Sequence, residues 1–129
     1  MSQMKIDHIT LIVSSLERSM PYYECLLPLV GFSRKRDYVW TDGDGFFLQF
    51  LQAKAGTTPY QRHGAGMNHL GLGASAPEQV YAIRDSMRAA GFEAPDVQDL
   101  DGAMALFMRD PDGLRFEITY YPPGVAVVD

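Results

Sequence analysis

The strongest constraint on this sequence is that it repeats itself. Six residues after His8 comes Ser14, and six residues after His69 comes Ser75, and each serine opens a Ser-x-x-Glu tetrapeptide. Such a tetrapeptide is typical of a helix start, where the serine accepts from a backbone amide and the glutamate reaches back. Both halves therefore predict a strand followed at the same distance by a helix.

The match continues to the end of each half. Gly31 follows the first expected helix and Gly91 follows the second, and glycine is common just past a helix end. Each half then closes with an Asp-x-Asp-Gly turn, which begins at Asp42 in the first half and at Asp110 in the second. Several coincidences in the same order indicate two copies of one unit.

The repeat aligns residues whose side chains can bind a metal. It pairs His8 with His69 and, four residues past the glycine of each turn, Gln49 with Glu117. We expect one domain, 1–129, with an α+β fold of two βαβββ modules. The modules are expected at 5–53 and 67–121, with a linker at 54–66 and a tail at 122–129.

Strand alternation predicts which side chains share a face. In the last strand Arg115, Glu117 and Thr119 lie opposite an apolar face, and a charged group in mid-strand must meet water, a partner or a metal. The corresponding face of the other strands carries His8, Thr10, Phe47, Gln49 and His69. We expect a curved, partly open mixed sheet whose polar face encloses a metal cleft.

Composition narrows the partners and the compartment. The net charge of -5 and the pI near 5.0 argue against nucleic acid or an anionic membrane as the main partner, because both require a basic surface. Cys25 is the single cysteine, so no intrachain disulfide is possible, which fits the cytoplasm. No apolar run approaches the roughly 20 residues of a membrane span.

The quoted residues resemble the vicinal oxygen chelate superfamily, which includes glyoxalase I, extradiol dioxygenases, fosfomycin-resistance transferases and bleomycin-binding proteins. The recognisable pieces are DHITLIVSSLERSMPYY, MNHLGLGA and MRDPDGLRFEI. The resemblance implies metal ligands on the first, fourth, fifth and eighth strands. In this chain those positions are His8, Gln49, His69 and Glu117. It also implies a small-molecule substrate and a homodimer.

Two imidazoles and a carboxylate suit a divalent Fe, Mn, Zn, Ni or Co ion. Such an ion can polarise a substrate carbonyl, and in a glyoxalase-like mechanism Glu117 is the catalytic base. Gln49 either coordinates through its carbonyl oxygen or hydrogen-bonds a substrate or water. Arg115 either holds a substrate carboxylate or phosphate through its fork or pairs with a neighbouring strand. The expected substrate-binding residues are Arg115, Thr10, Phe47 and Trp40.

Several functions share this ligand set. The first hypothesis is a metal-dependent lyase or isomerase, similar to lactoylglutathione lyase, that acts on a small oxygenated substrate. The second is an Fe(II) extradiol dioxygenase, although members with that activity are usually longer than 129 residues. A fosfomycin-type transferase fits Gln49 poorly. A metal-free drug- or metabolite-binding protein of the bleomycin-resistance type is the contrasting class, and retention of both histidines and Glu117 argues against it.

Overall fold

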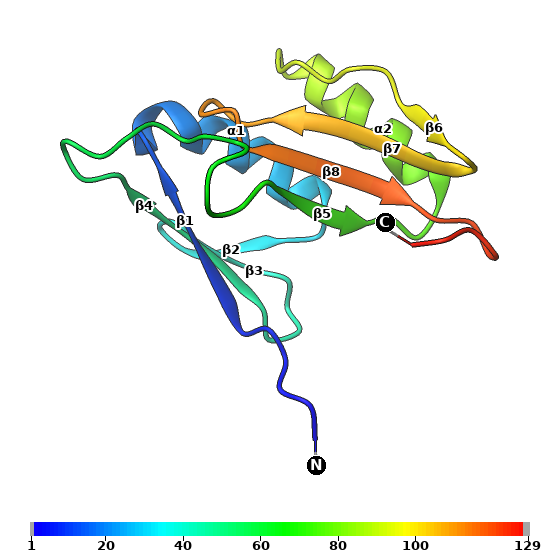
Figure 1. Cartoon of the computed structure of the whole chain (residues 1–129), viewed down its shortest axis with the longest axis horizontal. Helices are drawn as coiled ribbons and strands as arrows, with labels where there is room; N and C mark the ends of the chain where they lie inside the picture. Colours follow the sequence, from blue (N-terminus) through cyan, green and yellow to red (C-terminus); the bar gives the residue numbers. More distant parts are fainter. Residues whose placement is uncertain (1, 128–129) are drawn as a thin grey trace. The chain divides into compact units, whose positions relative to one another are not determined.

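The computed structural model describes residues 2–127, which form two compact units with their boundary between Pro59 and Tyr60. The boundary between them falls inside the segment 54–66 that was expected to be a linker. The first unit contains β1 (His8–Val13), α1 (Leu16–Leu29), β2 (Ser33–Arg36), β3 (Val39–Thr41) and β4 (Phe47–Gln52). The second contains β5 (His69–Gly73), α2 (Pro77–Ala89), β6 (Gln98–Leu100), β7 (Ala103–Arg109) and β8 (Arg115–Tyr120) (Figure 1).

The two units have the same topology. The strand orders are β1-β4-β3-β2 and β5-β8-β7-β6. The first and last strands of each unit run parallel, and the remaining neighbours run antiparallel, so each sheet is mixed. The fold class expected from the sequence, α+β with two βαβββ modules, is confirmed.

The repeat seen in the sequence is also a repeat of strand register. Thr10 lies opposite Gln49 in the β1–β4 pair, and Gly71 lies opposite Glu117 in the β5–β8 pair. Thr10 and Gly71 each lie two residues after the histidine of their unit, and Gln49 and Glu117 each lie four residues after the turn glycine. The residues that spacing aligned therefore occupy equivalent places in their sheets.

Both helices end in the same hydrogen-bonded motif. The Phe32 amide donates to the Leu27 carbonyl at 2.9 Å, and the Phe92 amide donates to the Met87 carbonyl at 3.0 Å. The intervening glycine has a positive φ in each case, 92° at position 31 and 90° at position 91. Only glycine adopts this backbone at little cost, so the predicted glycine stops are confirmed.

The helix starts differ from the expected capping boxes by one residue. Ser15, and not Ser14, caps α1, and its hydroxyl accepts from the Arg18 amide at 3.2 Å. Ala76 is the cap position of α2 and offers no side-chain acceptor. Oε1 of Gln79 in the first turn accepts instead from the amide of Ser75, the residue before the cap, at 2.7 Å. Each helix begins one residue later than the Ser-x-x-Glu spacing predicts.

The Asp-x-Asp-Gly turns fold alike because their first aspartate accepts two backbone amides. Oδ1 of Asp42 accepts from Asp44 and Phe46 at 2.8 and 3.0 Å. Oδ1 of Asp110 accepts from the amides of residues 112 and 114 at 2.9 and 2.8 Å. Asp110 is buried and Asp42 is exposed.

Alternation along the strands places an apolar face of each sheet against its helix. Helix α1 packs on β4, and α2 packs on β7 and β8. The fully buried side chains of these layers include Tyr23, Leu26, Phe50, Met87, Leu106, Phe116 and Ile118. The opposite face of each sheet carries the polar residues and is free of its own helix.

The segment between α2 and β7 contains one short strand. Residues 92–97 form no strand, and β6 follows at Gln98–Leu100. Pro95 lacks the amide that a sheet ladder needs, whereas Asp101 and Gly102, with φ of 53° and 97°, form the tight turn that pairs β6 with β7. Neither helix among the described residues has the length and apolarity that crossing a bilayer requires.

Candidate functional site

In the first unit, His8 and Gln49 project from the face of the sheet that α1 leaves uncovered. His8 begins β1, and Gln49 lies in the middle of β4, opposite Thr10. The Gln49 side-chain amide donates to the Thr10 hydroxyl at 2.6 Å. Because Nε2 is held by this bond, Oε1 of Gln49 is the atom left to accept a ligand. Thr10, expected to touch substrate, is thereby a positioning partner of Gln49.

One nitrogen of His8 is already engaged. Nδ1 of His8 lies 2.7 Å from Oδ2 of Asp7. A carboxylate at one ring nitrogen fixes the tautomer and leaves the other nitrogen, Nε2, with its lone pair outward. The sequence reasoning missed Asp7, since it considered only residues that share a strand face with the histidine.

A cavity of about 300 Å³ lies beside this pair. His8, Phe47 and Gln49 line it, as does Lys35, whose ammonium lies 5.4 Å from the centre of the Phe47 ring. Phe47 and Gln49 therefore line the same cavity, as their shared strand face predicted. Trp40 is a correction: it pairs with Leu48 on the buried face of the sheet and is 5% exposed, so it does not line this cavity.

In the second unit, His69 and Glu117 approach each other from β5 and β8. His69 Nε2 lies 4.0 Å from Glu117 Oε1. The residue opposite Glu117 is Gly71, and a Cβ at that position would be 4.0 Å from Oε2 of the carboxylate. Oε2 also accepts a hydrogen bond from the Thr119 hydroxyl, at 2.9 Å. Oε1 is therefore the oxygen that faces the imidazole.

His69 is oriented in the same way as His8. Its Nδ1 lies 2.7 Å from Oδ1 of Asn68, and the Asn68 amide donates to the Arg62 carbonyl at 2.9 Å. Because the amide of Asn68 must donate to that carbonyl, its oxygen faces the ring, and His69 Nδ1 is the protonated nitrogen. Nε2 of His69, like Nε2 of His8, is left free. Asn68 is the repeat equivalent of Asp7.

A cavity of about 840 Å³ adjoins this second pair. It is lined by His69, Glu117 and Thr119, and by residues of the β6–β7 turn and of the segment around Val125. Glu117 is half-buried, with 18% of its side chain exposed, and His69 is more open. The carboxylate is thus sheltered but accessible from the cavity.

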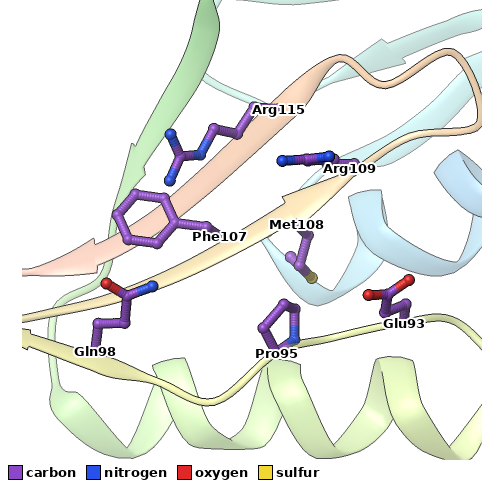
Figure 2. Close-up of a pocket in the computed structure, with 7 residues that line it drawn as sticks. All are labelled: Glu93, Pro95, Gln98, Phe107, Met108, Arg109 and Arg115. Carbon is purple, nitrogen blue, oxygen red and sulfur yellow. The ribbon is translucent and has the colours of Figure 1, made fainter.

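Arg115 lies two residues before Glu117 on the same face of β8. Its guanidinium sits 3.9 Å from the centre of the Phe107 ring (Figure 2). Partial burial lowers the pKa of Arg115, and repulsion from Arg62 and Arg109 lowers it further, while Glu117 opposes the change. The alternative role of Arg115, an ion pair with a neighbouring strand, is not formed among residues 2–127. Arg115 therefore remains a candidate substrate-binding residue.

The candidate ligands form two separate pairs, one in each unit: His8 with Gln49 and His69 with Glu117. Among residues 2–127, no group of three or more histidine, cysteine, aspartate or glutamate side chains is arranged to hold a metal ion. Each pair consists of a histidine with a free Nε2 and an oxygen donor on a neighbouring strand.

The family follows from this fold and from the sequence. The family model described as the Glyoxalase/Bleomycin resistance protein/Dioxygenase superfamily matches residues 5–118, and the chain belongs to this superfamily. The resemblance noted from the three sequence pieces is thereby confirmed. Members of the superfamily generally use divalent metals and act on small molecules.

The relatives that match share most of their length with this chain. The uncharacterized protein YqjT of Bacillus subtilis is 30% identical, covering 88% of this chain and 96% of the relative. The lactoylglutathione lyase of Haemophilus influenzae is also 30% identical, covering 88% and 90%. A glyoxylase/bleomycin resistance protein/dioxygenase domain from Frankia sp. EAN1pec superposes with a TM-score of 0.75 at 18% identity, covering 94% and 100%, and shows the shared fold.

Proposed function

We propose that this protein is a metal-dependent enzyme of the glyoxalase-like type, a lyase or isomerase for a small oxygenated substrate. The proposed metal ligands are His8, Gln49, His69 and Glu117, two from each unit. The observation that carries the proposal is the equivalence of the two pairs. Both histidines have Nδ1 engaged by the preceding side chain, so both keep Nε2 for an ion.

The donor atoms fit a divalent ion. Imidazole nitrogen and carboxylate oxygen bind such ions at about 2.0–2.2 Å, so one ion can bridge two donor atoms up to roughly 4.2 Å apart. The 4.0 Å between His69 Nε2 and Glu117 Oε1 satisfies this limit. The bond from Gln49 to Thr10 likewise leaves an amide oxygen available. No cysteine belongs to the set, which favours an open catalytic site over a closed structural one.

A bound divalent ion would supply Lewis acidity, which polarises a substrate carbonyl. Glu117 is the proposed base. Its Oε2 is held by the Thr119 hydroxyl, so Oε1, once it is no longer bound to the metal, is the oxygen that would take a proton from the substrate carbon and return it. Thr119 thereby fixes the direction from which the proton is taken. Phe47 offers an apolar wall beside Gln49.

The test begins with metal binding by the metal-stripped full-length protein. Mn, Co, Ni, Zn and anaerobic Fe(II) are titrated in turn by calorimetry. We expect one of them to bind tightly, and His8→Ala and His69→Ala each to weaken it. His63, the third histidine, is exposed, and His63→Ala is the matched control with unchanged affinity. Failure of every metal to bind tightly would overturn the proposal.

Activity then separates the enzyme classes. The loaded protein is assayed for formation of lactoylglutathione, the compound in the name of its Haemophilus influenzae relative, and for oxygen uptake with catechols. Turnover without oxygen uptake supports the lyase or isomerase. Oxygen uptake would assign the chain to the dioxygenases instead. The homodimer implied by the family resemblance stays a prediction, which light scattering checks.

A further inference from the structure

The second unit has another cavity, of about 360 Å³, that the proposed metal ligands do not line. It lies where β7 runs past the end of β6, next to the segment that leads into β6. Arg109 and Arg115 both line it, together with Phe107, Gln98 and Glu93 (Figure 2). A cavity with two guanidinium groups indicates a negatively charged occupant.

The strand register brings the two guanidinium groups to one side of the sheet. Arg109 and Arg115 are direct partners across the β7–β8 pair, so their side chains share a face. Figure 2 shows the Arg115 guanidinium over the Phe107 ring and the Arg109 guanidinium extending toward it. Like charges placed directly opposite each other destabilise a sheet, and this pair therefore needs a compensating group.

No carboxylate of the described residues forms an ion pair with either arginine, although Glu117 partly offsets the repulsion on Arg115. Arg84 and Arg88 of the same unit have ion pairs, with Asp85 at 2.9 Å and Asp96 at 3.2 Å. Arg109 and Arg115 have none within residues 2–127, although Glu93 lines the same cavity. The charge of Arg62 adds to the repulsion on Arg115. An anion bound between the two arginines would relieve it.

We propose that this cavity is an oxyanion subsite, in which Arg109 and Arg115 bind a carboxylate or phosphate group of the substrate. Guanidinium forks match the planar and tetrahedral oxygens of these groups. Gln98 can donate from its amide, and the Phe107 ring holds Arg115 in place while excluding water from one side. Glu93 also lines the cavity, and its single negative charge opposes an anion less than the two guanidinium charges attract it.

The subsite also limits the size of the substrate, an inference that rests on the proposed function. Arg115 and Glu117 share a face of β8 two residues apart, which is about 7 Å along a strand. His69 lies directly opposite Arg115 across the β5–β8 pair. A substrate that reaches both the candidate metal ligands and the subsite is therefore a short oxygenated acid or phosphate ester, with its anionic group a few bonds from the reacting oxygens.

The test uses the metal-stripped full-length protein and inorganic phosphate or acetate as the probe. Arginine Nε–H resonances are followed by NMR during the titration. We expect saturable shifts at Arg109 and Arg115. Arg109→Ala and Arg115→Ala should each weaken binding by about tenfold or more, since each loses charge-assisted hydrogen bonds. Arg84→Ala, which removes a partly buried, paired cation on α2, should leave the affinity unchanged.

Two further variants keep the outcomes separate. Arg115→Lys retains the charge without the fork and should bind phosphate with intermediate affinity; circular dichroism verifies that each variant is folded. His69→Ala should still bind phosphate. If the protein binds phosphate but no metal, the proposed metal-dependent function is overturned and the subsite is retained. Absence of saturable shifts in the wild-type protein, or an equal loss in Arg84→Ala, overturns the subsite whatever the metal titration gives.

Discussion

Nε2 of His69 and Oε1 of Glu117 face each other at 4.0 Å across the parallel strands β5 and β8, with Gly71 opposite the carboxylate. The distance is too long for a hydrogen bond, and the imidazole's other nitrogen is already taken by Asn68. An ion bound between these two atoms would contact both of them, as the proposed function requires.

Glu117→Gln removes the proposed base and changes little else in shape. A lost general base lowers kcat by about 100-fold or more, and we expect at least that loss in the metal-loaded protein if the proposed function holds. Thr119→Val deletes only the hydroxyl that holds Oε2 and should cost less. Metal content measured on each variant separates lost chemistry from lost metal. Full activity in Glu117→Gln would remove this residue from the base role.

The side chains that precede the two histidines should matter for metal affinity. Asp7→Ala and Asn68→Ala each free a histidine Nδ1, and loss of such a partner costs about 10- to 100-fold in affinity. Asp7→Asn is the informative control, because Asn68 makes the same 2.7 Å contact with an amide oxygen. We expect Asp7→Asn to retain most of the affinity in a chelator competition assay. Equal losses in Asp7→Asn and Asp7→Ala would mean that charge, not ring orientation, is the contribution of Asp7.

Gly71 keeps the space beside Glu117 open. Gly71→Ala should bind metal normally, because the new Cβ would be 4.0 Å from the carboxylate, an ordinary contact. Gly71→Thr reproduces in the second unit the Thr10 that binds Gln49 in the first. Its hydroxyl would donate to Glu117 and compete with the ion, and we expect about a tenfold loss of metal affinity. Calorimetric titration of both variants checks the difference; similar affinities would show that the space is not needed.

The sequence predicted the repeat, the topology and the polar faces because these depend on spacing and alternation alone. The face of the sheet on which Trp40 lies could not be predicted by counting alternate residues. The β2–β3 pairing has a bulge between Arg34 and Arg36, and Tyr38 has a φ of 63°. Each irregularity breaks the two-residue period, so the face of the next strand cannot be inferred from the last.

Asp7 and Asn68 were missed for a related reason. Within a strand, a residue points to the face opposite its neighbour, which excludes contact between residues i−1 and i. His8 and His69 are the first residues of their strands, and the backbone before them is not constrained to the pleat. The preceding side chain can therefore turn toward the imidazole. Such contacts require coordinates, because no periodicity marks them.

The repeat also supplies a matched pair for a stability prediction. Asp42 and Asp110 each accept two backbone amides in equivalent turns, but Asp110 is 5% exposed and Asp42 is exposed. Asp110→Ala leaves buried amides without a partner, and we expect a loss of about 2–4 kcal/mol in the free energy of unfolding. Water can replace the carboxylate in Asp42→Ala, so its loss should be about 1 kcal/mol or less. Urea denaturation of both variants measures the difference. Equal losses would show that the two bonds, and not their burial, determine the contribution of the turn.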